Sequence, residues 1–160
     1  MLYVVPIIIV AIFGYIGKQI SKVYVLRDYF YAELINLCEY LKNNISFKEE
    51  KINDMLSNYS FLYKKEIEKY LNINEIDVTE EDIKCFESCY FLKDNEREIL
   101  NKFFKELGDC GKRIEIEKIE SILMYLKEQK KKATENKIAN CGMIYKISLA
   151  VGAVVSILIM

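Results

Sequence analysis

Both ends of the chain are apolar and carry no charged side chain, and this feature limits the possible folds more than any other. Residues 2–17 read "LYVVPIIIVAIFGYIG" and residues 147–160 read "ISLAVGAVVSILIM", whereas every Asp, Glu, Lys and Arg lies between them. A helix needs roughly 20 residues to cross about 30 Å of hydrocarbon. The first segment reaches this length if Lys18 and Gln19 are included, and the second if it begins at Cys141. We therefore predict transmembrane anchors at residues 1–18 and 141–160.

Three basic side chains indicate the depth and the nature of these anchors. Lys146 lies near the start of the second anchor, where its methylenes can stay in lipid while its ammonium reaches the headgroups. The first anchor could instead be a cleaved signal peptide, but such a signal carries basic residues before its apolar run. Here the first charges, Lys18 and Lys22, follow the run. We expect a retained anchor.

The distribution of basic residues around the anchors predicts their orientation. Those that we expect at the membrane interface, together with Lys146, are Lys18, Lys22, Arg27, Lys130, Lys131 and Lys132. All six lie on the inner side of the two anchors in the sequence, as does Lys137, and the positive-inside rule then places residues 19–140 in the cytoplasm and both termini on the opposite side. The chain has five cysteines, an odd number, at irregular spacing. This agrees with reduced cytosolic thiols rather than with a set of disulfides.

The middle of the chain has the pattern of a helical domain. It lacks proline, and its apolar residues recur at intervals of three and four. The first stripe continues the N-terminal anchor and consists of Phe30, Leu34, Leu37, Leu41 and Ile45. A further stripe precedes the C-terminal anchor and consists of Ile119, Ile122, Leu123 and Leu126. We predict an all-α fold: a compact antiparallel bundle of about five or six helices, with both transmembrane helices continuous with the bundle.

Capping signals predict where the shorter helices begin. Ser46 with Glu49 forms a capping box ahead of a stripe that consists of Ile52, Met55, Leu56 and Tyr59. The other start signals are Ser60, Thr79 with Asp82, and Asp94. The helix after Asp94 has a wide apolar stripe of Ile99, Leu100, Phe103, Phe104 and Leu107, and Gly108 is its stop signal. The last helix is expected from Lys112.

Residues typical of catalysis or metal binding are few. The chain has no histidine, which is the commonest general base and a common zinc ligand. Cys85 and Cys89 have the spacing of a metal-binding pair, but no second pair accompanies them, and two small side chains packed in a bundle explain them better. The segment "LGDCGKR" lacks the glycine spacing and the Ser or Thr of a phosphate-binding loop. We predict no enzyme activity, no metal and no cofactor.

Nucleic acid is not an expected partner either. The basic run at Lys130, Lys131 and Lys132 lies beside an anchor, and the formal net charge of the chain is −1. Anionic lipid headgroups are the better partner for this run. Small residues of the second anchor, Gly142, Gly152, Ala153 and Ser156, are compatible with close helix packing but do not by themselves predict it.

The stretch "EILNKFFKELGDCGKRIEIEKIESILMYLKEQKKKATENKIANCGMIYKISLAVGAVVSILIM" resembles the C-terminal half of stage III sporulation protein AB of endospore-forming bacteria. That family has an anchor at each end and a cytoplasmic helical domain between them. Leu107 and Gly108 match its Leu-Gly pair, whereas Phe104 replaces a common glycine and Gly111 a usual aspartate. The N-terminal half is less similar.

The resemblance implies a part of the channel complex that joins the mother cell to the forespore, in the outer forespore membrane. The family is similar to the inner-membrane platform component of type II secretion and type IV pilus machines. The implied partners are the ATPase, stage III sporulation protein AA, and other membrane components of the complex. A homo-oligomer is compatible with this role. The alternative is a structural or regulatory helical subunit of another envelope secretion or pilus-like machine.

A partner-binding surface is expected at the turn between the Leu-Gly helix and the last helix. It comprises Leu107, Gly108, Asp109, Lys112 and Arg113. Exposed charge at a helix junction favours this hypothesis. In the competing interpretation, Leu107 and Gly108 only shape the turn.

Overall fold

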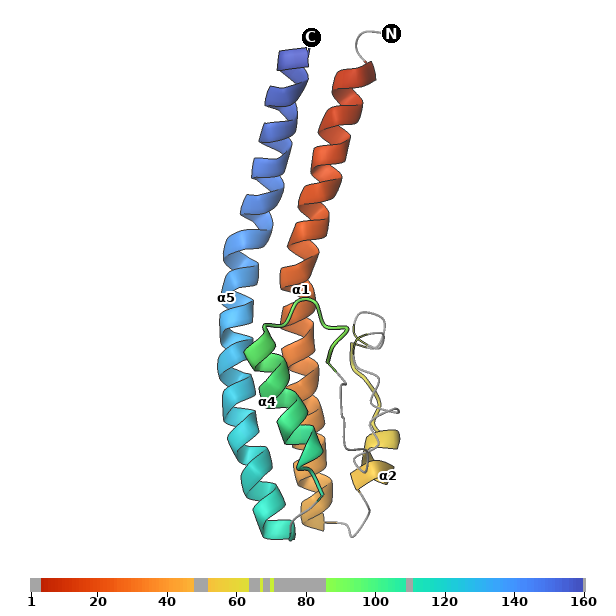
Figure 1. Ribbon diagram of the computed structural model, residues 1–160, viewed down its shortest axis with the longest axis vertical. Coiled ribbons are helices and arrows are strands. Elements are labelled where there is room, and N and C mark those ends of the chain that lie inside the picture. Colours follow the sequence, from red (N-terminus) through yellow and green to blue (C-terminus); the bar gives the residue numbers. More distant parts are fainter. Residues whose placement is uncertain are drawn as a thin grey trace. The chain divides into compact units, whose positions relative to one another are not determined.

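The computed structural model describes residues 4–47, 52–63, 67, 70, 86–108 and 111–159. These residues contain four helices, labelled in Figure 1 as α1 (Val4–Phe47), α2 (Ile52–Ser57), α4 (Asp94–Lys105) and α5 (Lys112–Ile159). No strand occurs among the described residues. The all-α prediction is therefore confirmed. The expected number of five or six helices is not confirmed, because four are found in the described part of the chain.

The chain divides into two compact units. We call Met1–Asp28 with Lys131–Met160 the paired-helix unit, and Tyr29–Lys130 the core unit. Helices α1 and α5 each contribute residues to both units. Each long helix thus joins an apolar terminal segment to a stripe of the helical domain without interruption, as the sequence predicts. The anchor boundaries at residues 18 and 141 stay a prediction.

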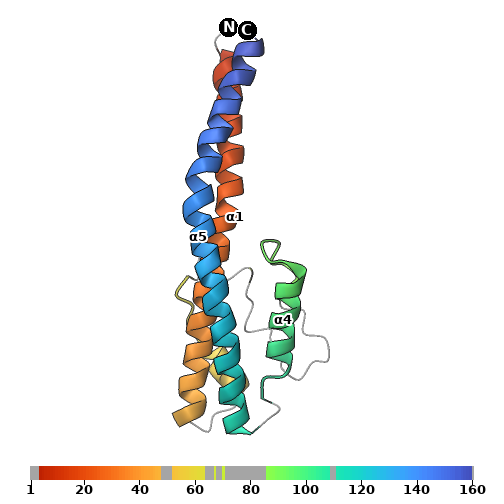
Figure 2. The same cartoon turned by 90° about the vertical axis from the view of Figure 1, so that its left-hand side faces the viewer.

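In the paired-helix unit, α1 and α5 run side by side in opposite directions (Figures 1 and 2). The Ser21 hydroxyl donates to the Cys141 carbonyl at 3.1 Å, and the Cys141 thiol donates to the Ser21 carbonyl at 3.4 Å. A Cβ added to Gly152 would lie 2.9 Å from the Cβ of Phe13 and 3.2 Å from the Cα of Val10. Close approach of the two helices therefore requires a glycine at position 152.

Two further glycines, both on α1, occupy the same interface. A Cβ on Gly17 would lie 2.6 Å from the Ser148 hydroxyl oxygen, and one on Gly14 would lie 3.2 Å from Leu149 Cδ2. By contrast, a Cβ on Gly142 would meet no atom within 4 Å. Of the two second-anchor glycines noted in the sequence, Gly152 thus lies at the helix contact and Gly142 does not.

The core unit buries the stripes that the sequence predicts. Phe30, Leu34, Leu37, Leu41 and Ile45 of α1 are all buried, and so are Ile119, Ile122, Leu123 and Leu126 of α5. Phe30 makes edge-to-face contacts with Phe86, at 5.9 Å between ring centroids, and with Phe91, at 5.3 Å. Such aromatic pairs contribute about 0.5–1.5 kcal/mol beyond the burial of their area. The stripe of α4 is narrower than predicted, because Ile99 is exposed.

Two predicted helix starts are corrected. Ser46 does not cap a new helix: it lies inside α1, where its hydroxyl donates to the Lys42 carbonyl at 2.8 Å. Asp94 is the first residue of α4 rather than its cap, and Lys93 takes the cap position with its backbone N–H donating to the Glu96 carboxylate at 2.9 Å. Short polar side chains such as Ser46 and Asp94 can bond to several nearby backbone groups, so the sequence alone does not fix which one they use.

Several sequence predictions fall outside the described residues. They concern Glu49, Thr79, Asp82 and most of the segment after Ser60. The prediction that Lys112 begins the last helix is confirmed, since α5 starts there. Gly108 follows the end of α4 as predicted.

Candidate functional site

The turn between α4 and α5 is shaped by its leucine and its glycine. Gly108 has φ = 98°, the only positive φ among the described residues, and this conformation is unfavourable for any residue with a Cβ. The Leu107 side chain is fully buried, so it does not form part of an exposed surface. A Cβ on Gly108 would lie 3.5 Å from Ile52 Cδ1, an ordinary contact, so the glycine is needed for its backbone conformation.

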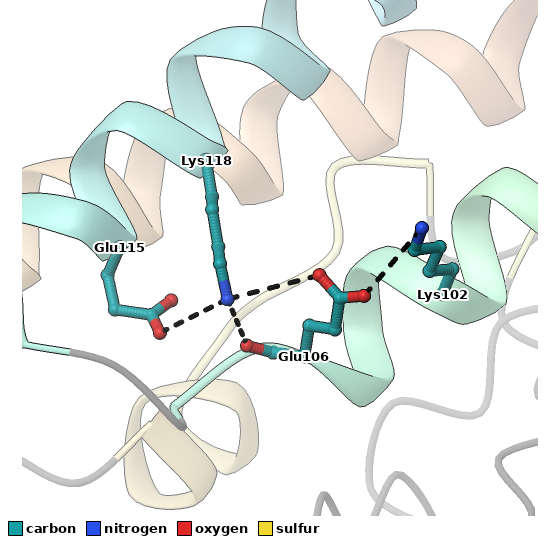
Figure 3. A network of polar contacts seen from close by, with 4 residues as sticks. All are labelled: Lys102, Glu106, Glu115 and Lys118. Atoms are coloured by element: carbon teal, nitrogen blue, oxygen red, sulfur yellow. Dashed lines mark hydrogen bonds and ion pairs between the residues drawn. The ribbon is translucent and has the colours of Figure 1, made fainter.

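A lysine of α5 closes the C-terminal end of α4 (Figure 3). Lys118 Nζ donates to the Glu106 carbonyl at 2.9 Å and lies 4.0 Å from carboxylate oxygens of both Glu106 and Glu115. Lys102 Nζ lies 4.0 Å from the other Glu106 carboxylate oxygen. Because the last carbonyls of a helix lack intrahelical donors, a cation here satisfies one and interacts favourably with the helix dipole. Sequence reasoning missed this contact between residues of two helices.

The charged residues of the turn lie where helix stability does not favour them. Lys112 and Arg113 are the first two residues of α5 and are both exposed, with 92% of the Arg113 side chain accessible. The N-terminal end of a helix carries a partial positive charge, which disfavours cations. Within the described part of the chain, Arg113 forms an ion pair with Glu117. The paired atoms are 3.2 Å apart and both side chains are solvent-exposed, so the contact contributes little. Asp109 lies outside the described residues.

The predicted interface residues are mostly exposed. Lys18, Lys22 and Lys146 are exposed on the paired-helix unit, where Arg27 is half-buried. Lys131 and Lys132 of the basic run are exposed, and Lys130 is half-buried. These positions agree with contact to headgroups, which stays a prediction.

Lys137, counted above as a basic flanking residue, has a carboxylate partner. Its ammonium lies 2.8 Å from the Asp28 carboxylate, which also accepts a 2.7 Å hydrogen bond from the Thr134 hydroxyl. Asp28 is buried, and both Lys137 and Thr134 lie on α5, so the cluster connects α1 to α5 within the paired-helix unit. Lys137 therefore contributes less free positive charge to the flank than its sequence position indicates.

A buried carboxylate organises the segment after α2 in the core unit. Glu33 is fully buried and accepts hydrogen bonds from the Tyr59 hydroxyl at 2.6 Å and from the backbone N–H groups of Leu62 and Tyr63 at 3.1 and 2.8 Å. Burial raises the pKa of Tyr59, and its hydrogen bond to Glu33 raises it further. The ring of Tyr63 stacks on Tyr29 with centroids 4.7 Å apart. Glu33 was not singled out from the sequence, where it is one acid among many.

Two cysteines of the core unit, Cys38 and Cys89, are buried. Burial raises the pKa of Cys38 to about 12, with a smaller contribution from Glu39, and burial likewise raises that of Cys89 to about 12. The Cys89 thiol donates to the Tyr70 carbonyl at 3.3 Å. Cys85, whose spacing from Cys89 matches a metal-binding pair but for which packing is the preferred interpretation, lies outside the described residues. Within the described part of the chain, no group of three or more His, Cys, Asp or Glu side chains is placed to hold a metal ion.

Helices α1 and α5 both contain a stretch long and apolar enough to cross a membrane. A core helix of a soluble protein can pass the same test, but it would be mostly buried. Here only 6% of the apolar stretch in α1 and 11% of that in α5 is buried. The two long apolar helices thus indicate a membrane protein.

The comparison with protein families agrees with these features. The family model described as stage III sporulation protein AB matches residues 3–160. The chain belongs to this family. The match covers both apolar segments, the core unit and the turn between α4 and α5, so the resemblance noted in the sequence is confirmed over nearly the whole chain. Membership supports a role in sporulation. No curated protein and no solved structure matches the chain.

Proposed function

We propose that the chain is a non-enzymatic, membrane-anchored platform of the channel complex between mother cell and forespore. In this role the core unit docks the cytoplasmic ATPase, stage III sporulation protein AA, at the outer forespore membrane. Family membership supports the sporulation role, and the two long apolar helices support the membrane location.

The continuity of α1 and α5 supports a mechanical role. Each helix combines apolar terminal residues with buried residues of the core unit, and no break in the helix separates them. A domain whose first and last helices both extend into the bilayer has its attachment fixed at two points. A force that the ATPase exerts on such a domain acts on the membrane assembly.

The position of Lys112 and Arg113 supports the docking surface. They are exposed cations at the end of α5 where the helix dipole disfavours positive charge, so a gain in helix stability does not explain them. Recognition of an acidic patch on a partner does explain them, since exposed charges accelerate association and select partners.

Site-specific photocross-linking in sporulating cells tests the proposal. A photoreactive residue at Lys112 or Arg113 is expected to capture the ATPase. Tyr90 is the matched control: it is also exposed in the core unit, but it precedes α4 whereas the turn follows α4. Capture from Tyr90 alone would agree with the platform role but would place the docking surface near Tyr90 rather than at Lys112 and Arg113. Failure of all positions to capture the ATPase would remove the docking role.

Charge reversal gives an independent measurement. The double substitution Lys112→Glu and Arg113→Glu is expected to reduce recruitment of the ATPase to membranes while leaving α5 folded, because acidic residues are favoured in the first turn. The charge-preserving pair Lys112→Arg and Arg113→Lys should recruit normally. Equal recruitment by both double variants would contradict the proposed surface.

A further inference from the structure

The paired-helix unit contains a groove of about 620 Å³ between α1 and α5. Most of its lining is apolar and includes Ile7, Val10, Ala11 and Leu149. Gly14 also lines it. The groove lies in the segments that are long and apolar enough to cross a membrane, so its natural contents are apolar.

One end of the groove is polar and positively charged. Lys18, Tyr15 and Tyr145 line it there, and among the described residues Lys18 is the only charged one of the lining. Tyrosine and lysine at the end of an apolar segment are typical of the headgroup region. The Tyr15 hydroxyl oxygen accepts a 2.6 Å hydrogen bond from Gln19 Nε2, which leaves its own proton available to a further acceptor. This end of the groove therefore offers a cation and a hydroxyl donor to an anion.

We propose that this groove binds an anionic phospholipid, with its phosphate at Lys18 and Tyr15 and an acyl chain along the apolar lining. The groove extends along α1 from Pro6 to Lys18, which at a rise of about 1.5 Å per residue corresponds to about 18 Å. A site of this length has the charged headgroup partner at one end and mostly apolar walls over the rest, where Ser156 is a further polar residue of the lining. This resembles the arrangement of groups in a phospholipid.

The Lys18 ammonium at one end of the groove favours an anionic lipid over a further apolar helix, because it offers a charge partner to a phosphate. The inference requires that α1 and α5 are inserted in a membrane and does not depend on docking of the ATPase, so the two proposals can fail separately.

Native mass spectrometry of the full-length chain tests the proposal. The chain is released from micelles that contain equal amounts of phosphatidylglycerol and phosphatidylcholine, and the ratio of retained anionic to zwitterionic lipid is measured. Lys18→Gln is expected to lower this ratio about five-fold, the effect of one lysine beside an anionic headgroup. Lys146→Gln is the matched control, because Lys146 is exposed at the corresponding level of α5 but does not line the groove.

A second pair of variants tests the apolar part. Ala11→Leu places additional side-chain atoms in the groove and is expected to reduce retention of both lipids, whereas Ala153→Leu, at an exposed position outside the groove, should not. Circular dichroism checks that all variants keep their helical content. Equal losses in Lys18→Gln and Lys146→Gln, equal retention in the two leucine variants, or a wild-type chain that retains a second copy of itself in place of lipid would each overturn the proposal.

Discussion

The paired-helix unit and the core unit differ in what surrounds their apolar side chains. In the core unit, Phe30 and Leu34 are fully buried. In the paired-helix unit, Ile7, Ile157 and Leu158 are 69%, 72% and 80% exposed. Exposure of apolar area to water costs about 25 cal/mol per Å². Apolar side chains with so much exposed area are suited to a lipid environment. The paired-helix unit is therefore suited to lipid and the core unit to water.

The two units also hold their helices together by different means. The core unit uses large rings such as Phe30 and Phe86. Their removal from water is a strong driving force for packing in this unit. Lipid supplies no such force between helices, and the paired-helix unit brings backbones close at Gly17 and Gly152. In each unit, α1 contributes one buried carboxylate whose partners are distant in sequence. This carboxylate is Asp28 in the paired-helix unit and Glu33 in the core unit.

Phe30→Ala should have the largest effect on the core unit. Phe30 is fully buried and contacts the rings of Tyr31, Phe86 and Phe91, so its truncation is expected to lower the free energy of unfolding by about 3–5 kcal/mol. Denaturant unfolding of the full-length chain in detergent measures the change. The matched substitution Phe13→Ala, in the paired-helix unit, should change it less, and a larger loss for Phe13→Ala would break the distinction between the units.

Glu33→Ala should have the second-largest effect on stability. It removes the acceptor of three hydrogen bonds and leaves the N–H groups of Leu62 and Tyr63 without that partner, at an expected cost of about 2–4 kcal/mol. Hydrogen exchange at these two amides should accelerate. Glu39→Ala is the control, since its carboxylate forms an exposed pair with Lys127 at 3.0 Å. Unchanged protection in Glu33→Ala would show that the carboxylate does not order this segment.

Gly152→Leu should separate the helices of the paired-helix unit without affecting the core unit. The new side chain would overlap Phe13 and the backbone of Val10, at a cost of about 1–3 kcal/mol. A Ser21→Cys substitution provides a thiol opposite Cys141, and the yield of an intramolecular cross-link between them measures the pairing. Gly142→Leu, at a position with open space, should leave the yield unchanged, and a similar fall in both variants would argue against glycine-dependent packing.

Gly108→Ala should have the smallest effect of the four. A Cβ at φ = 98° is expected to cost about 1–2 kcal/mol, although there is room for it beside Ile52. Denaturant unfolding measures this change as well. Gly111→Ala, whose Cβ would meet no atom within 4 Å and whose φ is not positive, is the control for glycine replacement in the same turn. Equal stability of the two variants would show that the left-handed turn carries no strain.

The candidate site shows how far sequence reasoning extends. Gly108 could be predicted as a helix stop and Lys112 as a helix start, because both signals are local. The burial of Leu107 follows from its place in the apolar stripe that the sequence predicts after Asp94. The contact of Lys118 with the Glu106 carbonyl could not be predicted, because it depends on how α5 lies against α4.

The sequence by itself determined the two apolar segments, the continuous helices that contain them and the buried stripes of the core unit. These features depend on periodicity and on local composition, which each segment carries without reference to the rest of the chain. Only the tertiary structure decided that Gly17 and Gly152 lie at the helix contact, that Asp28 binds Lys137 and that Glu33 binds the segment after α2. Each of these contacts joins residues far apart in sequence, and many chemically equivalent residues compete for the same partner until packing selects one.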